Sequence, residues 1–220
     1  MIELKYHNID CMEGMKHFPD KYFELAIVDP PYNVGASDGN FGRNVGTYRK
    51  DLKHYANKNT TPDKKYFDEL FRVSVNQIIW GANYYPQYLH HSGALIWIKK
   101  KCNKVLSDAE IAFQSFSKMV KIYDLMWYGY NKVNGSFESD NMSVIHPNQK
   151  PLILYEKILE DYAKQGDKIL DTHVGSGSSI IAFEKHGFDY CGFEIDKDYY
   201  DSSMKRILKH RELLQQEVLF

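Results

Sequence analysis

Short, mostly apolar runs alternate along the chain with segments whose apolar residues recur at helical spacing. Such runs, bounded by polar or glycine-containing segments, are typical of buried strands. They occur at residues 25–28, 77–80, 94–98, 168–171 and 190–194. Strands that alternate with helices in this way predict an α/β fold, with a mostly parallel sheet and helices on both faces.

Four helices are expected between and after these strands. One should begin with Pro62 at its first position, and another should open at Pro151. A third is expected over residues 178–186, ended by Gly187, and the last begins near Lys197. The apolar face of this last helix consists of Tyr200, Met204, Ile207 and Leu208.

Composition places the chain among ordinary folded proteins, since 43% of its 220 residues are hydrophobic and 26% are charged. A formal net charge of −1 neither supports nor excludes a nucleic-acid partner, which needs only a local basic surface. Cys11, Cys102 and Cys191 form no CxxC pair, so neither a disulfide framework nor a zinc site is expected. Without a signal-like N-terminus or an apolar run of membrane length, we expect a single cytoplasmic domain over residues 1–220.

The run Asp29-Pro30-Pro31-Tyr32 follows directly on the first strand. A carboxylate at the C-terminal end of a strand lies where open α/β sheets bind ligands. Prolines have no N–H to donate, so Asp29 and the Pro30 carbonyl form a surface of acceptors beside the Tyr32 ring. Such a surface suits an NH2 group on a planar base, for example adenine N6 or cytosine N4. A Pro-Pro turn capped by Asp29 is the alternative explanation of this run.

An exocyclic amine is a poor nucleophile because its lone pair is delocalised into the ring. Two acceptors that hold its hydrogens would favour a more tetrahedral nitrogen and free the lone pair to attack a methyl donor. Catalysis of this kind depends on positioning and local electrostatics, and it requires no metal.

A second constellation is a strand that ends at Asp171, followed by a Gly175-Ser176-Gly177 loop and a helix. Glycines let the backbone approach a ligand closely, and the helix N-terminus favours an anionic group. The next strand ends at Glu194, a spacing suited to an acid that accepts hydrogen bonds from ribose hydroxyls. A dinucleotide site would have a third glycine near Ile180, and its absence favours S-adenosylmethionine over NAD.

Residues 33–60 lack a periodic apolar face and are rich in Gly, Asn, Lys, Arg and Tyr. A long loop in a compact domain is usually functional or disordered, and its place directly after Tyr32 favours a flexible DNA-contacting loop. Its interleaved basic and aromatic side chains suit phosphate contacts and base stacking. The candidate DNA-binding residues are Arg43, Tyr48, Arg49, Lys50 and Lys53. A second basic cluster, for which a solvated charge run is the alternative, consists of Lys99, Lys100, Lys101 and Lys104.

Together with the run His146-Pro147-Asn148-Gln149-Lys150-Pro151, these motifs resemble the permuted β-type amino-methyltransferases of DNA. In that family the catalytic Asp-Pro-Pro-Tyr precedes the glycine loop, and His-Pro-x-x-Lys-Pro lies just upstream of the loop. The resemblance covers residues 3–200. It implies a Rossmann-like S-adenosylmethionine-dependent methyltransferase fold with a circularly permuted motif order, DNA as partner, and neither a metal nor a membrane. It leaves room for a homodimer and for a restriction endonuclease partner.

The resemblance also implies roles for individual residues. Asp29 and Pro30 would hold the target amine, Pro31 would complete the rigid turn, and Tyr32 would stack on a flipped base. Asp10 would contact the adenine of the cofactor. The implied cofactor-binding residues are Asp10, Cys11, Lys150, Asp171, His173, Gly175, Ser176, Gly177, Ser178, Glu194 and Asp196. Of these, Lys150 matches a lysine near the cofactor's carboxylate end, and Glu194 matches the acid that binds the ribose.

Two further segments bear on the resemblance. Residues 80–84, Trp-Gly-Ala-Asn-Tyr, match a stretch of the family that follows a central strand, and a structural turn is the alternative. Thr172 and His173 replace the Pro and Phe of the family's Asp-Pro-Phe-x-Gly-Ser-Gly-Thr loop, a departure that bears on the tuning of cofactor binding.

The family's target-recognition region is reduced here to residues 129–145, too few for a separate domain. We expect sequence specificity to be short or relaxed, or to come from residues 33–60 or a second subunit. Mapping of methylated positions on DNA would separate these alternatives.

The leading Asp29 favours adenine N6, because cytosine-N4 enzymes of this type more often begin with Ser. Relatives that begin with Asn methylate RNA or protein glutamine, and both Asp29 and the permuted order argue against a protein substrate. An inert DNA-binding relative should have lost the acid or the glycine loop, and both are present. DNA adenine-N6 methylation is therefore the expected function, with cytosine-N4 methylation and inert DNA binding as alternatives.

Overall fold

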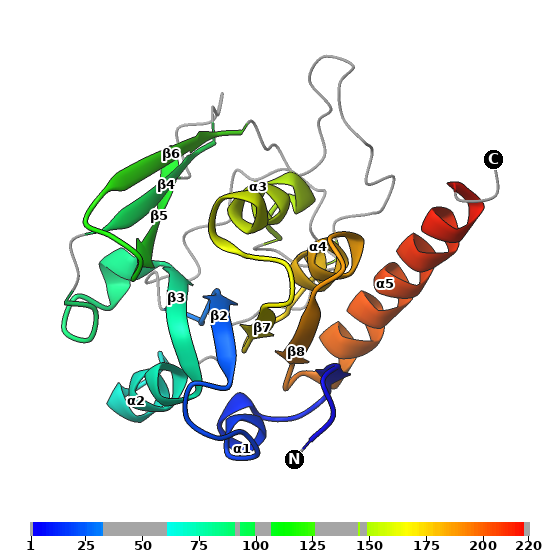
Figure 1. Ribbon diagram of the computed structural model, residues 1–220, viewed down its shortest axis with the longest axis horizontal. Helices are drawn as coiled ribbons and strands as arrows, with labels where there is room; N and C mark the ends of the chain where they lie inside the picture. The colour runs from blue at the N-terminus through cyan, green and yellow to red at the C-terminus, as the bar shows by residue number, and fades with distance from the viewer. Residues whose placement is uncertain are drawn as a thin grey trace, which may run out of the picture.

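The computed structural model describes residues 2–32, 61–90, 93–99, 107–125, 145 and 149–217. Within these residues eight strands form one sheet, ordered β1-β8-β7-β2-β3-β5-β4-β6 (Figure 1). The strands are β1 (Tyr6–His7), β2 (Phe23–Val28), β3 (Ser74–Trp80), β4 (Ala94–Ile98), β5 (Ala109–Gln114), β6 (Val120–Asp124), β7 (Lys168–Asp171) and β8 (Asp189–Phe193). The helices are α1 (Cys11–Met15), α2 (Lys64–Val73), α3 (Leu152–Tyr162), α4 (Ser178–Lys185) and α5 (Lys197–Glu217), with a short 3-10 helix, η3 (Ala82–Tyr84).

The sheet is mostly parallel. Only β5 runs antiparallel to its neighbours, β3 and β4, while every other described pair is parallel. At the centre, β2 pairs with β3 on one side and with β7 on the other, where Leu25 lies opposite Ile169. The end of β2 therefore lies beside the end of a strand from the far half of the chain.

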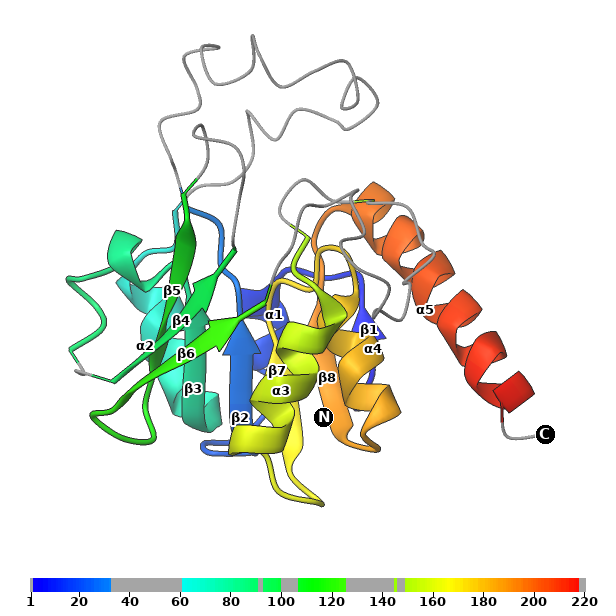
Figure 2. The ribbon, with the colours of Figure 1, turned by 90° about the horizontal axis from the view of Figure 1, so that it is seen from above.

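Helices cover both faces of the sheet, as predicted. Figure 1 shows α1 and α2 on one face and α3, α4 and α5 on the other, and Figure 2 shows α5 extending away from the sheet. The alternation along β2 explains this arrangement, because Leu25 and Ile27 belong to the core under α3 and α4, while Ala26 and Val28 belong to the core under α1 and α2. Two apolar layers thus hold one sheet between them.

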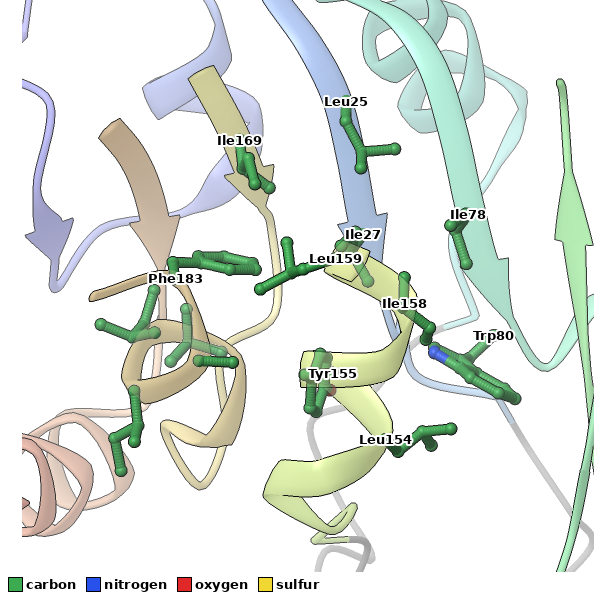
Figure 3. Close-up of a cluster of buried hydrophobic side chains, with 14 of the residues drawn as sticks. Leu25, Ile27, Ile78, Trp80, Leu154, Tyr155, Ile158, Leu159, Ile169 and Phe183 are labelled. Atoms are coloured by element: carbon green, nitrogen blue, oxygen red, sulfur yellow. The ribbon is translucent and has the colours of Figure 1, made fainter. Parts of the chain in front are cut away.

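The core under α3 supports the end of β3. In Figure 3, Leu154 and Ile158 of α3 lie beside Trp80, the last residue of that strand, and Leu159 lies toward Ile27. All five side chains are at most 1% exposed. Burial of an aliphatic side chain of this size contributes roughly 1.5–3 kcal/mol to folding. The strand ends that carry the polar residues described below therefore rest on a close-packed base.

The five predicted strands and four predicted helices are present, with corrections at two positions. Pro62 is not the first residue of α2, because the Asp63 side chain accepts hydrogen bonds from the amides of Lys65 and Tyr66 and so caps a helix that begins at Lys64. Asp10 caps α1 in the same way. On α5, Leu208 is 47% exposed and does not belong to the buried face.

Two strands, β5 and β6, were not predicted. Acidic Glu110 interrupts the apolar pattern of β5, and most side chains of β6 are exposed, so neither strand shows a continuous apolar run. No helix in the described part of the chain is long and apolar enough to span a membrane.

The turn after β2 is held in place by the segment that follows β3. The ring of Tyr84 stacks on that of Tyr32, with ring centroids 4.2 Å apart and planes 9° from parallel. The buried Tyr85 hydroxyl donates to the carbonyls of Pro30, at 3.0 Å, and Pro31, at 2.7 Å. Residues 80–84, for which a structural turn was the alternative, therefore pack directly against the Asp-Pro-Pro-Tyr run.

Gly81 makes this packing possible. Its φ of 71° is in the left-handed region, which favours glycine. A Cβ added at Gly81 would lie 2.6 Å from Cε1 of Tyr32, which is closer than van der Waals contact allows. Any side chain at this position would push the Tyr32 ring out of its place.

We predict that Gly81→Ala destabilises the protein more than Gly166→Ala does. Both glycines have positive φ, so alanine adds backbone strain of roughly 1–2 kcal/mol at each position. Among the described residues, no atom beyond Gly166 and its two chain neighbours lies within 4 Å of a Cβ built there. The Cβ at Gly81 instead meets Tyr32 and should cost a further 1–3 kcal/mol or so. Free energies of unfolding in urea measure the difference, and equal losses would contradict the proposed role of Gly81.

Candidate active site

Three predicted acids lie at the same edge of the sheet. Asp29 directly follows β2, Asp171 ends β7, and Glu194 directly follows β8. These strands are neighbours and parallel, so their carboxyl ends meet at one edge, where open α/β sheets bind ligands. The fold therefore unites the Asp-Pro-Pro-Tyr turn with the glycine loop.

The Asp29 carboxylate has one engaged oxygen and one free one. Its Oδ2 accepts a hydrogen bond from the Lys150 ammonium. Its Oδ1 is buried and accepts no hydrogen bond within the described residues. Burial raises the pKa of Asp29 above its usual range, although the positive charge of Lys150 opposes the rise. An acceptor left without a donor costs free energy in such a place, so Oδ1 is suited to bind an incoming N–H group.

Lys150 connects the two halves of the site. Its ammonium contacts Asp29, lies 3.3 Å from Oε2 of Glu110, and lies 5.3 Å from the centroid of the Trp80 ring. Its backbone carbonyl accepts a hydrogen bond of 2.9 Å from the Ser178 hydroxyl, at the start of α4. The resemblance places this lysine near the carboxylate of the cofactor, but its ammonium lies against the catalytic turn.

Glu110 is a site residue that the sequence analysis missed. It lies on β5, and its two oxygens contact Lys99 and Lys150. Burial acts to raise the pKa of Glu110, but the two lysines lower it below its usual range. The available signal was an acid flanked by apolar residues in the run Ala-Glu-Ile-Ala-Phe, because a buried acid usually has a charged partner.

The glycine loop has a defined shape set by hydrogen bonds. Gly175 and Gly177 have positive φ values of 54° and 81°. One oxygen of Glu194 accepts from the Gly175 amide at 3.0 Å, and the other accepts from the Asp196 amide at 2.9 Å. Arg206 of α5 donates to the Ser176 carbonyl at 2.8 Å. The loop, the end of β8 and α5 are therefore held together.

Asp171 is the most deeply buried of the three acids, with 1% exposure. One carboxylate oxygen accepts from the His173 amide at 2.9 Å. Burial raises the pKa of Asp171 to about 7, and the nearby charges of Asp29 and Glu194 add to the rise. A positive group on a ligand would reverse this effect, since an opposite charge favours the ionised form.

Thr172 and His173, the two residues that differ from the family's loop, belong to a series of polar contacts. The Tyr66 hydroxyl and the Thr172 hydroxyl lie 2.7 Å apart, and Thr172 Oγ1 lies 2.9 Å from Nδ1 of His173. Nε2 of His173 lies 4.0 Å from the sulfur of Cys11. Burial lowers the pKa of His173 to about 4, so the imidazole is neutral at pH 7. Burial also raises the pKa of Cys11 to about 12, which keeps it a thiol.

Two predicted cofactor residues act as helix caps. Asp10 accepts from the Met12 amide at 2.7 Å, and Asp196 accepts from the amides of Asp198 and Tyr199 at the start of α5. Both follow strands, β1 and β8, that are parallel neighbours. These caps use Oδ1 of each acid.

The predicted DNA-binding residues Arg43, Tyr48, Arg49, Lys50 and Lys53 lie outside the described residues, as do most of residues 129–145. Of the second basic cluster, Lys99 is described. It contacts Glu110 and lies 5.1 Å from the centroid of the Trp97 ring, so its charge is engaged inside the protein. In the part of the chain described here, no three His, Cys, Asp or Glu side chains gather as a metal site would require.

Known proteins share this architecture. YubD of Escherichia coli K12 is 24% identical over 94% of this chain and 91% of its own. The structure of the M1.HpyAVI–SAM complex covers 94% of this chain and 100% of its own, with 19% identity and a TM-score of 0.59. The match to the structure of the cytosine-N4-specific PvuII DNA methyltransferase covers 96% of this chain and 91% of that one, with 14% identity and a TM-score of 0.61. The two structures establish a Rossmann-like α/β fold for this chain.

Residues 44–205 match the family N6_N4_Mtase, described as DNA methylase. The matched region runs from the segment after the Asp-Pro-Pro-Tyr turn, through the glycine loop, into α5. Because this match covers most of the chain, the protein belongs to the DNA methylase family of amino-methyltransferases.

Proposed function

We propose that the protein transfers a methyl group from S-adenosylmethionine to N6 of adenine in DNA. The observation that carries this proposal is the free, buried Oδ1 of Asp29 beside the Tyr32 turn, next to the glycine loop. A donor N–H is what that oxygen lacks, and an exocyclic amine provides one. Membership in the DNA methylase family supports the same reaction class.

The catalytic turn acts through its acceptors. Oδ1 of Asp29 would accept one hydrogen of the amine, and the Pro30 carbonyl would accept the other through the lone pair that Tyr85 leaves open. Held in this way, the nitrogen has its lone pair free for attack. The amine would gain positive charge as its bond to the methyl carbon forms and the bond between that carbon and the sulfonium sulfur breaks, and the carboxylate of Asp29 would stabilise that charge. Loss of one N–H proton would then leave a neutral methylamino group. Pro31 keeps the turn rigid.

Tyr32 would supply the surface for a flipped base. Tyr84 occupies one face of its ring, so stacking takes place on the other face or requires Tyr84 to move. Extrusion of a base from the duplex costs a few kcal/mol or so, and aromatic stacking offsets part of that cost. The stack also sets the plane in which the amine meets Asp29.

The glycine loop fits S-adenosylmethionine. When bound, this cofactor supplies an electrophilic methyl on a sulfonium. The two positive-φ glycines let a ligand approach the backbone at the start of α4, and buried Asp171 suits a positively charged amino group. Glu194 would bind the ribose, and Asp10 the adenine ring. The remaining proposed cofactor contacts are Cys11, Lys150, His173, Gly175, Ser176, Gly177, Ser178 and Asp196.

Cytosine N4 is the second candidate target. The PvuII enzyme, which shares this fold, is cytosine-N4-specific, and the acceptor pair described here would hold either amine. The leading acid of the turn, Asp29, favours adenine over cytosine. Whether adenine N6 or cytosine N4 is methylated would depend on which base stacks on Tyr32.

Mass spectrometry of nucleosides from DNA incubated with the protein and S-adenosylmethionine should find N6-methyladenine. Detection of N4-methylcytosine without N6-methyladenine would reject the adenine assignment. Asp29→Ala should lower kcat by about a hundredfold or more, a loss typical of a group that stabilises developing charge. Cofactor affinity should be nearly unchanged. The matched control is Asp161→Ala, which removes an ion-paired acid that contacts Lys121 and Tyr123, away from the site.

We predict that affinity for S-adenosylmethionine rises between pH 6 and pH 8. Asp171, whose pKa is raised to about 7, is mostly neutral at the lower pH and ionised at the higher, where it attracts the ammonium group of the cofactor. Calorimetry over this range measures Kd. Asp171→Asn should flatten the dependence and weaken binding at pH 8 by about tenfold, equivalent to about 1.4 kcal/mol. A pH dependence that persists in this variant would assign the titration to another group.

The raised pKa of Asp171 also predicts how the stability of the protein without cofactor depends on pH. The folded-state pKa of Asp171 lies above the unfolded value of about 3.9. Folding therefore loses stability as pH rises from about 4 to about 7, since the unfolded chain ionises first. Urea unfolding without cofactor should show that Asp171→Asn removes part of this loss.

DNA contact is proposed for Arg43, Tyr48, Arg49, Lys50 and Lys53. The double variant Arg49→Ala, Lys50→Ala should weaken DNA binding and flatten its dependence on salt. The slope of log K against log salt falls by about 0.9 for each lost contact with a duplex phosphate. Changing Lys164 and Lys209 to Ala serves as the control, because both are exposed. Lys164 lies just after α3 and Lys209 in the C-terminal half of α5, away from the strand ends that carry the acids. An unchanged slope in the first variant would remove this loop from the interface.

A further inference from the structure

Four charged side chains form a continuous row beneath the catalytic turn. Lys99 of the segment after β4 contacts Glu110 of β5, Glu110 contacts Lys150, and Lys150 contacts Asp29. Positive and negative groups alternate along the row. Ion pairs and hydrogen bonds thus link the end of β2, the paired strands β4 and β5, and the segment before α3.

The row is buried and electrically balanced. The side chain of Lys150 is 3% exposed, and those of Lys99, Asp29 and Glu110 are 16–20% exposed. Two ammonium groups and two carboxylates sum to zero charge. Removal of one member from a buried ion pair leaves an uncompensated charge, which is strongly destabilising. Loss of any one member would therefore leave a neighbouring charge without a partner.

Lys150 is shared between two carboxylates. It donates to Oδ2 of Asp29 and lies 3.3 Å from Oε2 of Glu110, while Lys99 holds the other oxygen of Glu110. An ammonium has three N–H donors and a flexible stem. With Asp29 as its only partner, it could move between Oδ1 and Oδ2. The contact with Glu110 would hold it on the Oδ2 side, where it lies in the structure.

We propose that Glu110 is a positioning residue for methyl transfer, which acts through Lys150 to keep Oδ1 of Asp29 open for the target amine. The inference deepens the proposed function and rests on it for its kinetic test. Glu110 itself does not touch the substrate in this assignment. Lys99 supports it by fixing the orientation of its carboxylate.

The charge of Glu110 also acts on the ionisation of Asp29. The negative charge of Glu110 raises the pKa of Asp29, and the positive charges of Lys150 and Lys99 lower it. Other ionisable groups that interact electrostatically with Asp29 are Tyr32, Tyr85, Tyr155 and Asp171. Glu110 and Lys99 therefore shift Asp29 in opposite directions from the same side of the site.

The decisive experiment compares Glu110→Gln with Lys99→Gln in the full chain. Each variant keeps most of the side chain's length and removes one charge. In Glu110→Gln, kcat should fall by roughly tenfold or more, since misplacement of a reacting group by an ångström can cost about a hundredfold. The acid limb of its kcat–pH profile should move to lower pH. In Lys99→Gln the acid limb should move to higher pH, because a positive charge near Asp29 is lost.

Opposite shifts cannot arise from loss of stability, which would lower activity without moving the limb in two directions. Glu24→Gln is the matched control, because Glu24 pairs with Lys168 near the opposite end of β2 and should leave the profile unchanged. Affinity for S-adenosylmethionine should be the same in wild type and Glu110→Gln. Acid limbs that coincide in wild type and both variants would overturn the proposal.

A titration without substrate separates this proposal from the proposed function. The carboxyl ¹³C signal of Asp29, assigned with Asp29→Asn, should have its midpoint lowest in Glu110→Gln, intermediate in wild type and highest in Lys99→Gln. Identical midpoints would reject the coupling whether or not the protein methylates DNA. Shifted midpoints without methyl transfer by the wild type would retain the charge coupling and reject the proposed reaction instead.

Discussion

The pairing of β2 with β7 is the contact on which the site depends. These strands come from opposite halves of the chain, yet Leu25 lies opposite Ile169 and Ala26 opposite Leu170. Because the two strands are parallel, the turn after β2 and the loop after β7 leave the sheet at the same edge. An amine acceptor and a nucleoside-binding loop are thus brought together by backbone hydrogen bonds between apolar strands. The order of the two motifs along the chain has no bearing on the result.

The second constraint is the limited access of water to the acids of the site, which makes the placement of charged partners decisive. Asp171 is fully buried and Asp29 and Glu110 are mostly buried, and an ionised group in such a place needs a partner to remain ionised. The structure treats them differently: Asp29 and Glu110 have lysine partners, whereas Asp171 has hydrogen-bond donors and no basic side chain in contact among the described residues. One edge of one sheet therefore holds carboxyl groups with distinct protonation behaviour.

Much of this architecture could be predicted from the sequence because its strands are short apolar runs that end in acids. The positions of Asp29, Asp171 and Glu194 at one edge follow from that pattern and from parallel pairing. The strand β5 was not predicted, since Glu110 interrupts its apolar pattern and finds its partners only in the folded chain. The direction of the Lys150 side chain could not be predicted either, because it depends on contacts with residues far away in the sequence.

Contacts of individual side chains account for the smaller differences between the predicted and the observed structure. Pro62 could have opened a helix, but Asp63 offers a side-chain acceptor to two amides and moves the start past it. Thr172 and His173 depart from an apolar pattern, and the hydroxyl of Tyr66 explains how they are accommodated. Residues 80–84 could not be distinguished from a plain turn until the stack of Tyr84 on Tyr32 was known.

Glu194 has a consequence for how such a protein can change over evolutionary time. Its two oxygens hold the Gly175 amide and the Asp196 amide, so one side chain maintains both the glycine loop and the approach to α5. A substitution here would alter the loop's shape and the proposed nucleoside contact in a single step. The loop and the proposed nucleoside contact therefore depend on the same side chain. The side chains of Thr172 and His173 lie outside this coupling, because they contact Tyr66 and Cys11 rather than the Gly175 and Asp196 amides.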